Sequence, residues 1–148
     1  MSIPPKRILV ATDFSDGAKA ALELAIAIAK PLDAEIVLMH AWEIPIYAFP
    51  DGAMVPGGLF DGLEAASDEA LQTQLRLYAK SGVKMRGALR MGPAWREIGI
   101  VAEQEKADLV VMGTHGRRGV VRWVLGSVAE RVVRSSPIPV LTVGPSKT

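Results

Sequence analysis

Short apolar runs that alternate with helical periodicity constrain the fold of this 148-residue chain more than any other feature. Uninterrupted apolar runs are typical of strands buried on both faces, as in a parallel sheet. Strands separated by helices need crossover connections, so the pattern predicts an α/β domain with helices on both faces of a parallel sheet. The runs that predict strands are Ile8–Ala11, Ile36–Met39, Leu109–Met112 and Pro139–Val143.

Capping and helix-breaking residues give the expected helix ends. Ser15 or Asp16 is the expected N-cap of the first helix, and Pro31 is expected to stop it. A second helix is expected to begin near Phe60 or Leu63 and to end at Gly82, which suits the position after a helix.

Polar alternation marks one further strand. Apolar and polar residues alternate over positions 83–90, which predicts a strand with one solvated face near a sheet edge. Pro93 suits the first turn of a third helix. A fourth helix is expected from about Ser127 to the residue before Pro137, and the fifth strand follows it.

Composition indicates one globular domain over residues 1–148. Half of the residues are apolar, with 49% hydrophobic composition, which argues against disorder. The net charge of +1 gives no reason to expect nucleic acid as a partner. The absence of cysteine excludes disulfides and thiolate chemistry. No signal peptide is expected and the apolar stretch Leu24–Ala29 is too short to cross a bilayer, so we expect a cytoplasmic protein without membrane contact.

A glycine-rich stretch after the fourth predicted strand is the strongest functional signal. Glycine at 113, 116 and 126 lets the backbone approach a ligand closely. Gly126 and Ser127 also stand at a helix start, where free N–H groups favour an anion. The alternative is that these glycines only serve turns. The stretch is not a P-loop, because the chain contains no G-x-x-x-x-G-K-[ST] sequence. It is not the dinucleotide fingerprint either, because that motif follows the first strand, where Ala11–Phe14 has no glycine.

These residues resemble a known family. The spacing Gly113-x2-Gly116-x9-Gly126-Ser127 is similar to the ATP-binding signature G-x2-G-x9-G-[ST] of universal stress proteins. Arg7–Ser15, Ala107–Gly116 and Ser136–Leu141 also resemble the corresponding parts of that family. The likeness covers nearly the whole chain and is weakest at Trp42–Ala65. It implies the ATP-binding branch and a Rossmann-like fold, an open five-stranded parallel sheet of order 3-2-1-4-5.

The resemblance also implies a site for ATP, with Mg2+ bound through the phosphates. Asp13 would lie near the ribose or a phosphate-bound metal, and Ala41 would read the base edge. Gly113 and Gly116 would line the ribose and phosphate path, and the helix start would present amides to the phosphates. The residues expected to bind the nucleotide are Thr12, Asp13, Met39, Ala41, Met112, Gly113, His115, Gly116, Arg117, Gly126, Ser127 and Val128.

Several of these residues have alternative interpretations. Asp13 could be a plain helix cap, and His115 could face solvent rather than phosphate. His40 is expected to be a packed structural residue. Arg117, Arg118 and Arg122 form a basic cluster in which one arginine would approach the γ-phosphate, or which is a solvated loop face. The two histidines lack metal-ligand spacing, so no protein-built metal site is expected.

Two segments bear on assembly. The apolar loop Glu43–Gly58 is longer than an ordinary connection, which predicts that it packs over the nucleotide pocket or across an oligomer interface. The fifth strand would be an apolar sheet edge. Related proteins dimerise through this strand, so the resemblance implies a homodimer through Val140, Leu141 and Val143.

The sequence is compatible with three functions. The first is a nucleotide-binding regulatory module whose dimer surface is offered to an unidentified protein partner. The second is a slow ATPase or phosphotransferase, for which Asp13 is the only evident acid–base group. The third is a scaffold dimer with a vestigial pocket. The spaced glycines favour the first, and no catalytic residue is assigned.

Overall fold

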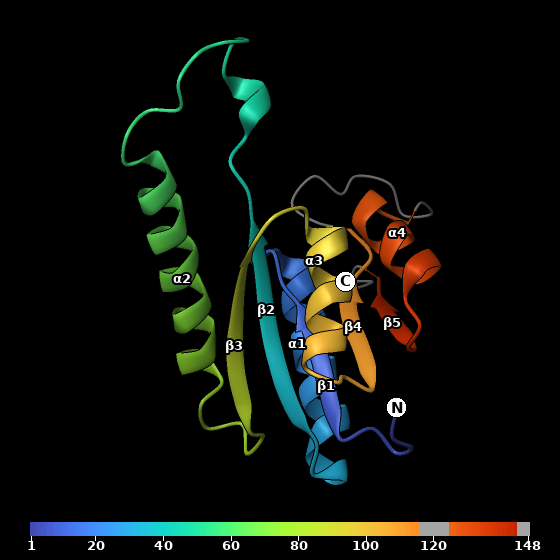
Figure 1. Ribbon diagram of the computed structural model, residues 1–148. Helices are drawn as coiled ribbons and strands as arrows, with labels where there is room; N and C mark the ends of the chain where they lie inside the picture. The colour runs from blue at the N-terminus through green and yellow to red at the C-terminus, as the bar shows by residue number, and fades with distance from the viewer. Residues whose placement is uncertain (116–124, 145–148) are drawn as a thin grey trace.

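The described residues, 1–115 and 125–144 in a computed structural model, form a five-stranded parallel sheet between two layers of helices (Figure 1). The strand order is β3-β2-β1-β4-β5, which confirms the predicted fold class. The elements are β1 (Arg7–Ala11), α1 (Asp16–Leu32), β2 (Glu35–Trp42), a 3-10 turn η1 (Ile46–Ala48), α2 (Leu59–Leu77), β3 (Met85–Met91), α3 (Ala94–Gln104), β4 (Leu109–Gly113), α4 (Ser127–Ser135) and β5 (Val140–Val143).

The three central strands are apolar on both faces because helices cover both. Leu9 and Val37 lie in the core shared with α3 and α4, whereas Ile8 and Val10 lie in the core shared with α1 and α2. β1 pairs with β2 on one side and with β4 on the other, with Ala11 opposite both Met39 and Met112. The carboxyl ends of β1, β2 and β4 therefore meet at one edge of the sheet.

α1 begins as predicted but does not end at Pro31. Ser15 is its N-cap, and the Ser15 hydroxyl accepts a hydrogen bond from the Ala18 N–H. Pro31 lies inside the last turn, and the helix ends at Leu32. Asp33 is left-handed at φ 51° and its N–H caps the last carbonyls, so a left-handed residue stops the helix.

The prediction that α2 ends at Gly82 was wrong. The helix ends at Leu77, and Gly82, at φ +85°, shapes the turn into β3 instead. β3 is an edge strand, as its alternation predicted. α2 packs against the face of β3 that carries Gly87, and a Cβ on Gly87 would stand 3.0 Å from Leu75 Cδ1 of α2. Pro93 lies directly before α3 as its N-cap rather than within its first turn.

The segment between β2 and α2 extends away from the sheet as an arm, residues 43–58 (Figure 1). The side chains of Ile46, Tyr47 and Met54 are 72%, 86% and 90% exposed. These three side chains are therefore not covered by the described part of the chain, and both expected roles of the segment stay predictions. Among the described residues, no helix combines the length and the apolar character needed to span a membrane.

Candidate functional site

The turn after β1 is held by its own backbone and by β2. The N–H of Thr12 donates to the Met39 carbonyl at 2.9 Å, and the Thr12 hydroxyl accepts from the Phe14 N–H at 3.0 Å. Phe14 is left-handed at φ 64°, so the chain reverses sharply between β1 and α1. Thr12 is buried and shapes this turn.

Asp13 stands half-buried in the same turn. Its Oδ1 accepts hydrogen bonds from the N–H of Ser15, at 3.0 Å, and from the Ser15 hydroxyl. Because Ser15 also caps α1, these bonds fix the carboxylate at the carboxyl end of β1. The helix cap is Ser15 rather than Asp13, so Asp13 holds the turn before the helix, and it lies at the edge where a ligand role would need it.

His40, on β2, contacts the turn between β1 and α1. Its Nδ1 lies 2.8 Å from the Thr12 carbonyl oxygen, and its ring stacks at a tilt on Phe14 with the centroids 4.4 Å apart. The expectation of a packed, hydrogen-bonded structural histidine agrees with these contacts.

The end of β4 approaches the start of α1 very closely. A Cβ on Gly113 would stand 3.0 Å from the Gly17 carbonyl carbon, and a Cβ on Gly17 would stand 3.0 Å from the His115 oxygen. Both residues therefore have to be small for the backbones to meet, because backbone cannot give way as a side chain can. The close approach joins the β1 turn to the segment after β4.

Thr114 connects the segment after β4 to β5 and to the start of α4 through backbone hydrogen bonds. Its N–H donates to the Val143 carbonyl at 3.0 Å and its carbonyl accepts from the Gly126 N–H at 2.8 Å. A Cβ on Gly126 would stand only 2.5 Å from that carbonyl oxygen. The start of α4 is thereby held against the residue that follows β4.

His115 follows with one nitrogen engaged. Its Nδ1 lies 2.9 Å from the Thr114 hydroxyl. Its Nε2 is buried and has no hydrogen-bond partner among residues 1–115 and 125–144. An unpartnered buried nitrogen is costly, so this atom calls for a polar partner.

The first turn of α4 lacks a side-chain cap. Gly126 is the N-cap and has no side chain to accept from the helix amides. Ser127 and Val128 follow as the first helical residues, and Val128 is half-buried against the α3–α4 core. The N–H groups of this turn and the positive end of the helix dipole lie next to Thr114, the residue that follows β4.

A family model described as the universal stress protein family matches residues 4–144. The chain belongs to the universal stress protein family. It is 38% identical over 140 residues to Universal stress protein MJ0531 of Methanocaldococcus jannaschii, covering 93% of this chain and 81% of the relative. A relative from Thermus aquaticus is 37% identical over 139 residues, covering 93% and 98% of the two chains. The solved structure of MJ0577 has a TM-score of 0.81 at 29% identity, covering 97% and 98%.

In this universal stress protein, the residues predicted from sequence gather at one edge. Thr12 and Asp13 follow β1, Gly113 ends β4 and His115 lies two residues beyond it, and the start of α4 is bonded to Thr114 between them. Met39 and Met112, 1% and 5% exposed, are buried in the core between the sheet, α3 and α4. Both side chains are core residues, whereas the Ala41 side chain is only half-buried.

Part of the expected set lies outside the described residues. Gly116 and Arg117 belong to this part, as do Arg118 and Arg122. In the described ranges, no group of three or more His, Cys, Asp or Glu side chains is placed to hold a metal ion.

The close backbone contact at Gly17 and the two backbone hydrogen bonds of Thr114 were not predicted from the sequence. Gly17 is a glycine in the first turn of an otherwise alanine-rich helix, which could have signalled a close approach. Thr114 precedes His115 inside the recognised motif, but its two backbone bonds join segments distant in sequence. No local pattern shows such bonds.

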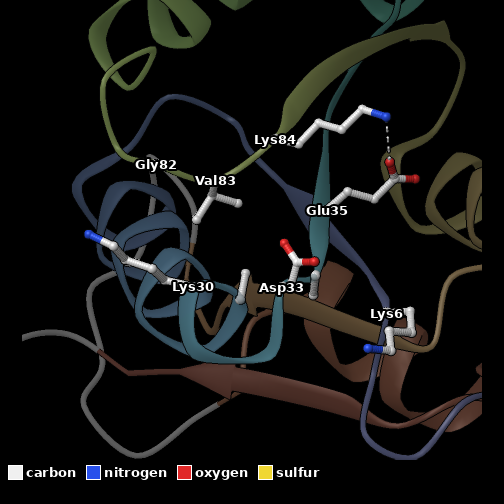
Figure 2. A pocket seen from close by; sticks show the side chains of 9 residues that line it. Lys6, Lys30, Asp33, Glu35, Gly82, Val83 and Lys84 are labelled. Atoms are coloured by element: carbon white, nitrogen blue, oxygen red, sulfur yellow. Dashed lines mark ion pairs between the residues drawn. The ribbon is translucent and has the colours of Figure 1, made fainter.

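A cleft of about 260 Å3 lies at the opposite, amino end of the sheet (Figure 2). Lys84 Nζ is 3.6 Å from Glu35 Oε2, and Figure 2 shows Lys30 and Lys6 pointing away from Lys84. The lysines do not converge on a shared point, so this cleft is not the candidate nucleotide site.

Proposed function

We propose that this universal stress protein is a regulatory module that binds ATP at the carboxyl ends of β1, β2 and β4, with residues 1–148 acting as one domain. Mg2+ would be bound through the phosphates, with the Asp13 carboxylate as the nearest acidic group at the turn. The module would act in the cytoplasm as a homodimer that offers its surface to a protein partner.

One observation carries the proposal. The Gly126 N–H bond to Thr114, at 2.8 Å, holds the uncapped start of α4 against the segment that follows β4. Helix N-termini of this kind are ready anion sites, because several N–H groups and the dipole act together. A polyphosphate at this edge would accept hydrogen bonds from Ser127 and Val128.

His115 supports the same proposal from a second side. Its buried Nε2 needs a polar partner that the described residues do not supply. A ribose hydroxyl or a phosphate oxygen at the edge would provide one.

The choice of adenine nucleotide follows from the family signature. Two universal stress proteins of this fold, 22% and 24% identical to the chain with TM-scores of 0.72 and 0.66, are solved in complex with cAMP and with dAMP. At such identity they bear on the fold alone. The preference for ATP rests on Gly113, Gly126 and Ser127 at the spacing of the ATP-binding signature.

The test is to identify small molecules released from the denatured purified protein by mass spectrometry, and then to titrate it calorimetrically with ATP and Mg2+. Binding that Gly126→Val abolishes without unfolding the protein supports the proposal. Absence of binding at millimolar ATP would contradict it and favour the scaffold dimer. Phosphate release that disappears in Asp13→Ala would favour a slow ATPase or phosphotransferase.

The proposed homodimer would form through β5, the edge strand opposite β3. Pro139 and Val143 carbonyls accept from β4, so alternation points the backbone groups of Val140 and Thr142 to the free edge. A second β5 would satisfy these groups.

A further inference from the structure

The arm, residues 43–58, is an apolar surface with a strong charge bias. Ile46, Tyr47 and Met54 are largely exposed. No lysine or arginine occurs between Lys30 and Arg76, so the arm and the first four turns of α2 carry acidic residues and no basic one, and among these acids Glu69 is paired with Arg76 from the last turn of α2. Those acidic residues are Glu43, Asp51, Asp61, Glu64, Asp68 and Glu69.

The opposite end of the same flank is basic. α2 ends at Leu77, which is 69% exposed, and Lys80 follows in the turn. Lys30 reaches this turn from α1, since its Cε would lie 3.5 Å from a Cβ on Gly82. Figure 2 shows the Lys30 ammonium directed outward from the cleft. The Glu35 carboxylate in this region is already paired with Arg7 and Lys84.

The two patches cannot meet within one molecule. α2 joins them, with the acidic arm before its first residue, Leu59, and the basic turn after its last, Leu77. A helix of this length is about 28 Å long, which keeps the patches apart. Both ends of α2 are visible in Figure 1, with the arm beyond one end and the turn to β3 at the other.

We propose that α2 and the arm form a docking surface for a second copy of this chain. The two α2 helices would run antiparallel, so that each acidic arm lies on the basic turn of the other copy. A two-fold axis across α2 makes both contacts at once and closes the pair. α2 is free for this contact because Leu71 is its only fully buried residue.

The charge of the arm favours a second copy of this chain over other partners. The acidic arm would repel an anionic membrane surface or a nucleic acid, which an exposed apolar arm could otherwise attract. The complementary basic and apolar patch is present on the chain itself, at Leu77 and Lys80. The surface lies at the β3 edge and so is independent of an association through β5.

Charge reversal with mixing tests the proposal. One variant carries Asp51→Lys and Asp61→Lys, and another carries Lys30→Glu and Lys80→Glu. In sedimentation at equal concentration, each variant alone should show a smaller particle mass than the wild type, with self-association through α2 weakened at least tenfold. An equimolar mixture of the two, and a chain carrying all four changes, should recover the wild-type mass. Association should weaken from about 50 to 500 mM NaCl, since the Debye length shortens.

Glu103→Lys is the matched control, because Glu103 is an exposed acid on α3, away from both patches. It should leave the particle mass unchanged. Thermal unfolding of every variant checks that the fold is intact. Equal mass for wild type and both variants, or a mixture that does not recover the mass, would overturn the proposal. Neither result bears on nucleotide binding, which is measured separately.

Discussion

Gly126 lies so close to Thr114 that a Cβ at position 126 would stand 2.5 Å from the Thr114 carbonyl oxygen, the same atom that accepts the Gly126 N–H bond. The contact joins the residue after β4 to the residue before α4. Any side chain at 126 must move one of these two backbones, since neither is a flexible side-chain end.

Gly126→Ala is therefore expected to displace the start of α4. We predict that the affinity for ATP falls at least tenfold, because the amides of Ser127 and Val128 no longer reach the phosphates. The free energy of unfolding should fall by about 1–3 kcal/mol, the usual effect of strain at a special backbone position. Calorimetric titration and urea unfolding measure the two quantities.

Gly99→Ala is the matched control for this substitution. A Cβ at Gly99 meets nothing within 4 Å, and the residue lies inside α3. The change should leave ATP affinity unaltered and should raise stability by up to about 1 kcal/mol, the difference in helix propensity. Equal loss of affinity in both variants would contradict the role assigned to the Gly126 contact.

The packing of α2 on the sheet centres on Leu71, its one fully buried side chain, with Leu75 partly buried beside it. Leu71 is 1% exposed and packs in the core formed with α1 and the sheet. Leu71→Ala should lower the free energy of unfolding by about 2–4 kcal/mol, through lost burial and the cavity left behind. Gln72→Ala, at an exposed position beside it on α2, should change it by less than about 0.5 kcal/mol. Denaturant unfolding of both variants decides whether α2 is held in this way.

The strands were predictable because burial on both faces leaves a local trace. Ile8–Val10 and Ile36–Leu38 have no polar residue, and all are fully buried. The alternation at β3 likewise reported its place at the sheet edge. These patterns, with the crossover rule, were enough for the parallel sheet.

The contacts that shape the site were not predictable in the same way. Gly17 and Gly113 meet across a long sequence separation, and no periodicity shows that meeting. The end of α2 was misplaced because Gly82 serves the next turn, five residues beyond the helix. A glycine in the sequence shows that a backbone is unusual there, without showing which element needs it.

Thr142→Pro tests the β5 edge without disturbing the sheet. The Thr142 N–H points away from β4, so proline removes only an edge donor. We expect the variant to remain folded and to lose the association through β5, halving the mass measured by light scattering. An unchanged mass with an intact thermal transition would refute the dimer through this strand.

The N-terminal segment is fixed to the start of β4 by one carboxylate. Asp108, 6% exposed, accepts hydrogen bonds from the N–H groups of Ser2, Lys6 and Arg7, the last two at 2.9 and 3.0 Å. Burial alone would raise the pKa of Asp108, but the three backbone donors outweigh it and hold the pKa below its ordinary value of 3.8. Asp108→Ala should lower the free energy of unfolding by about 1–3 kcal/mol at pH 7, because three part-buried bonds from backbone N–H groups to a carboxylate are lost.

The pH dependence of this loss has a definite sign. A carboxyl whose folded pKa is depressed contributes stability above its unfolded value, and the contribution is lost as the pH falls through the folded pKa. The difference between wild type and Asp108→Ala should therefore be full at pH 7 and should shrink below pH 3.8. Urea unfolding across this range, with the exposed acid changed in Asp51→Ala as control, measures it. A difference that stays constant down to the lowest pH would show that the Asp108 charge does not hold the segment.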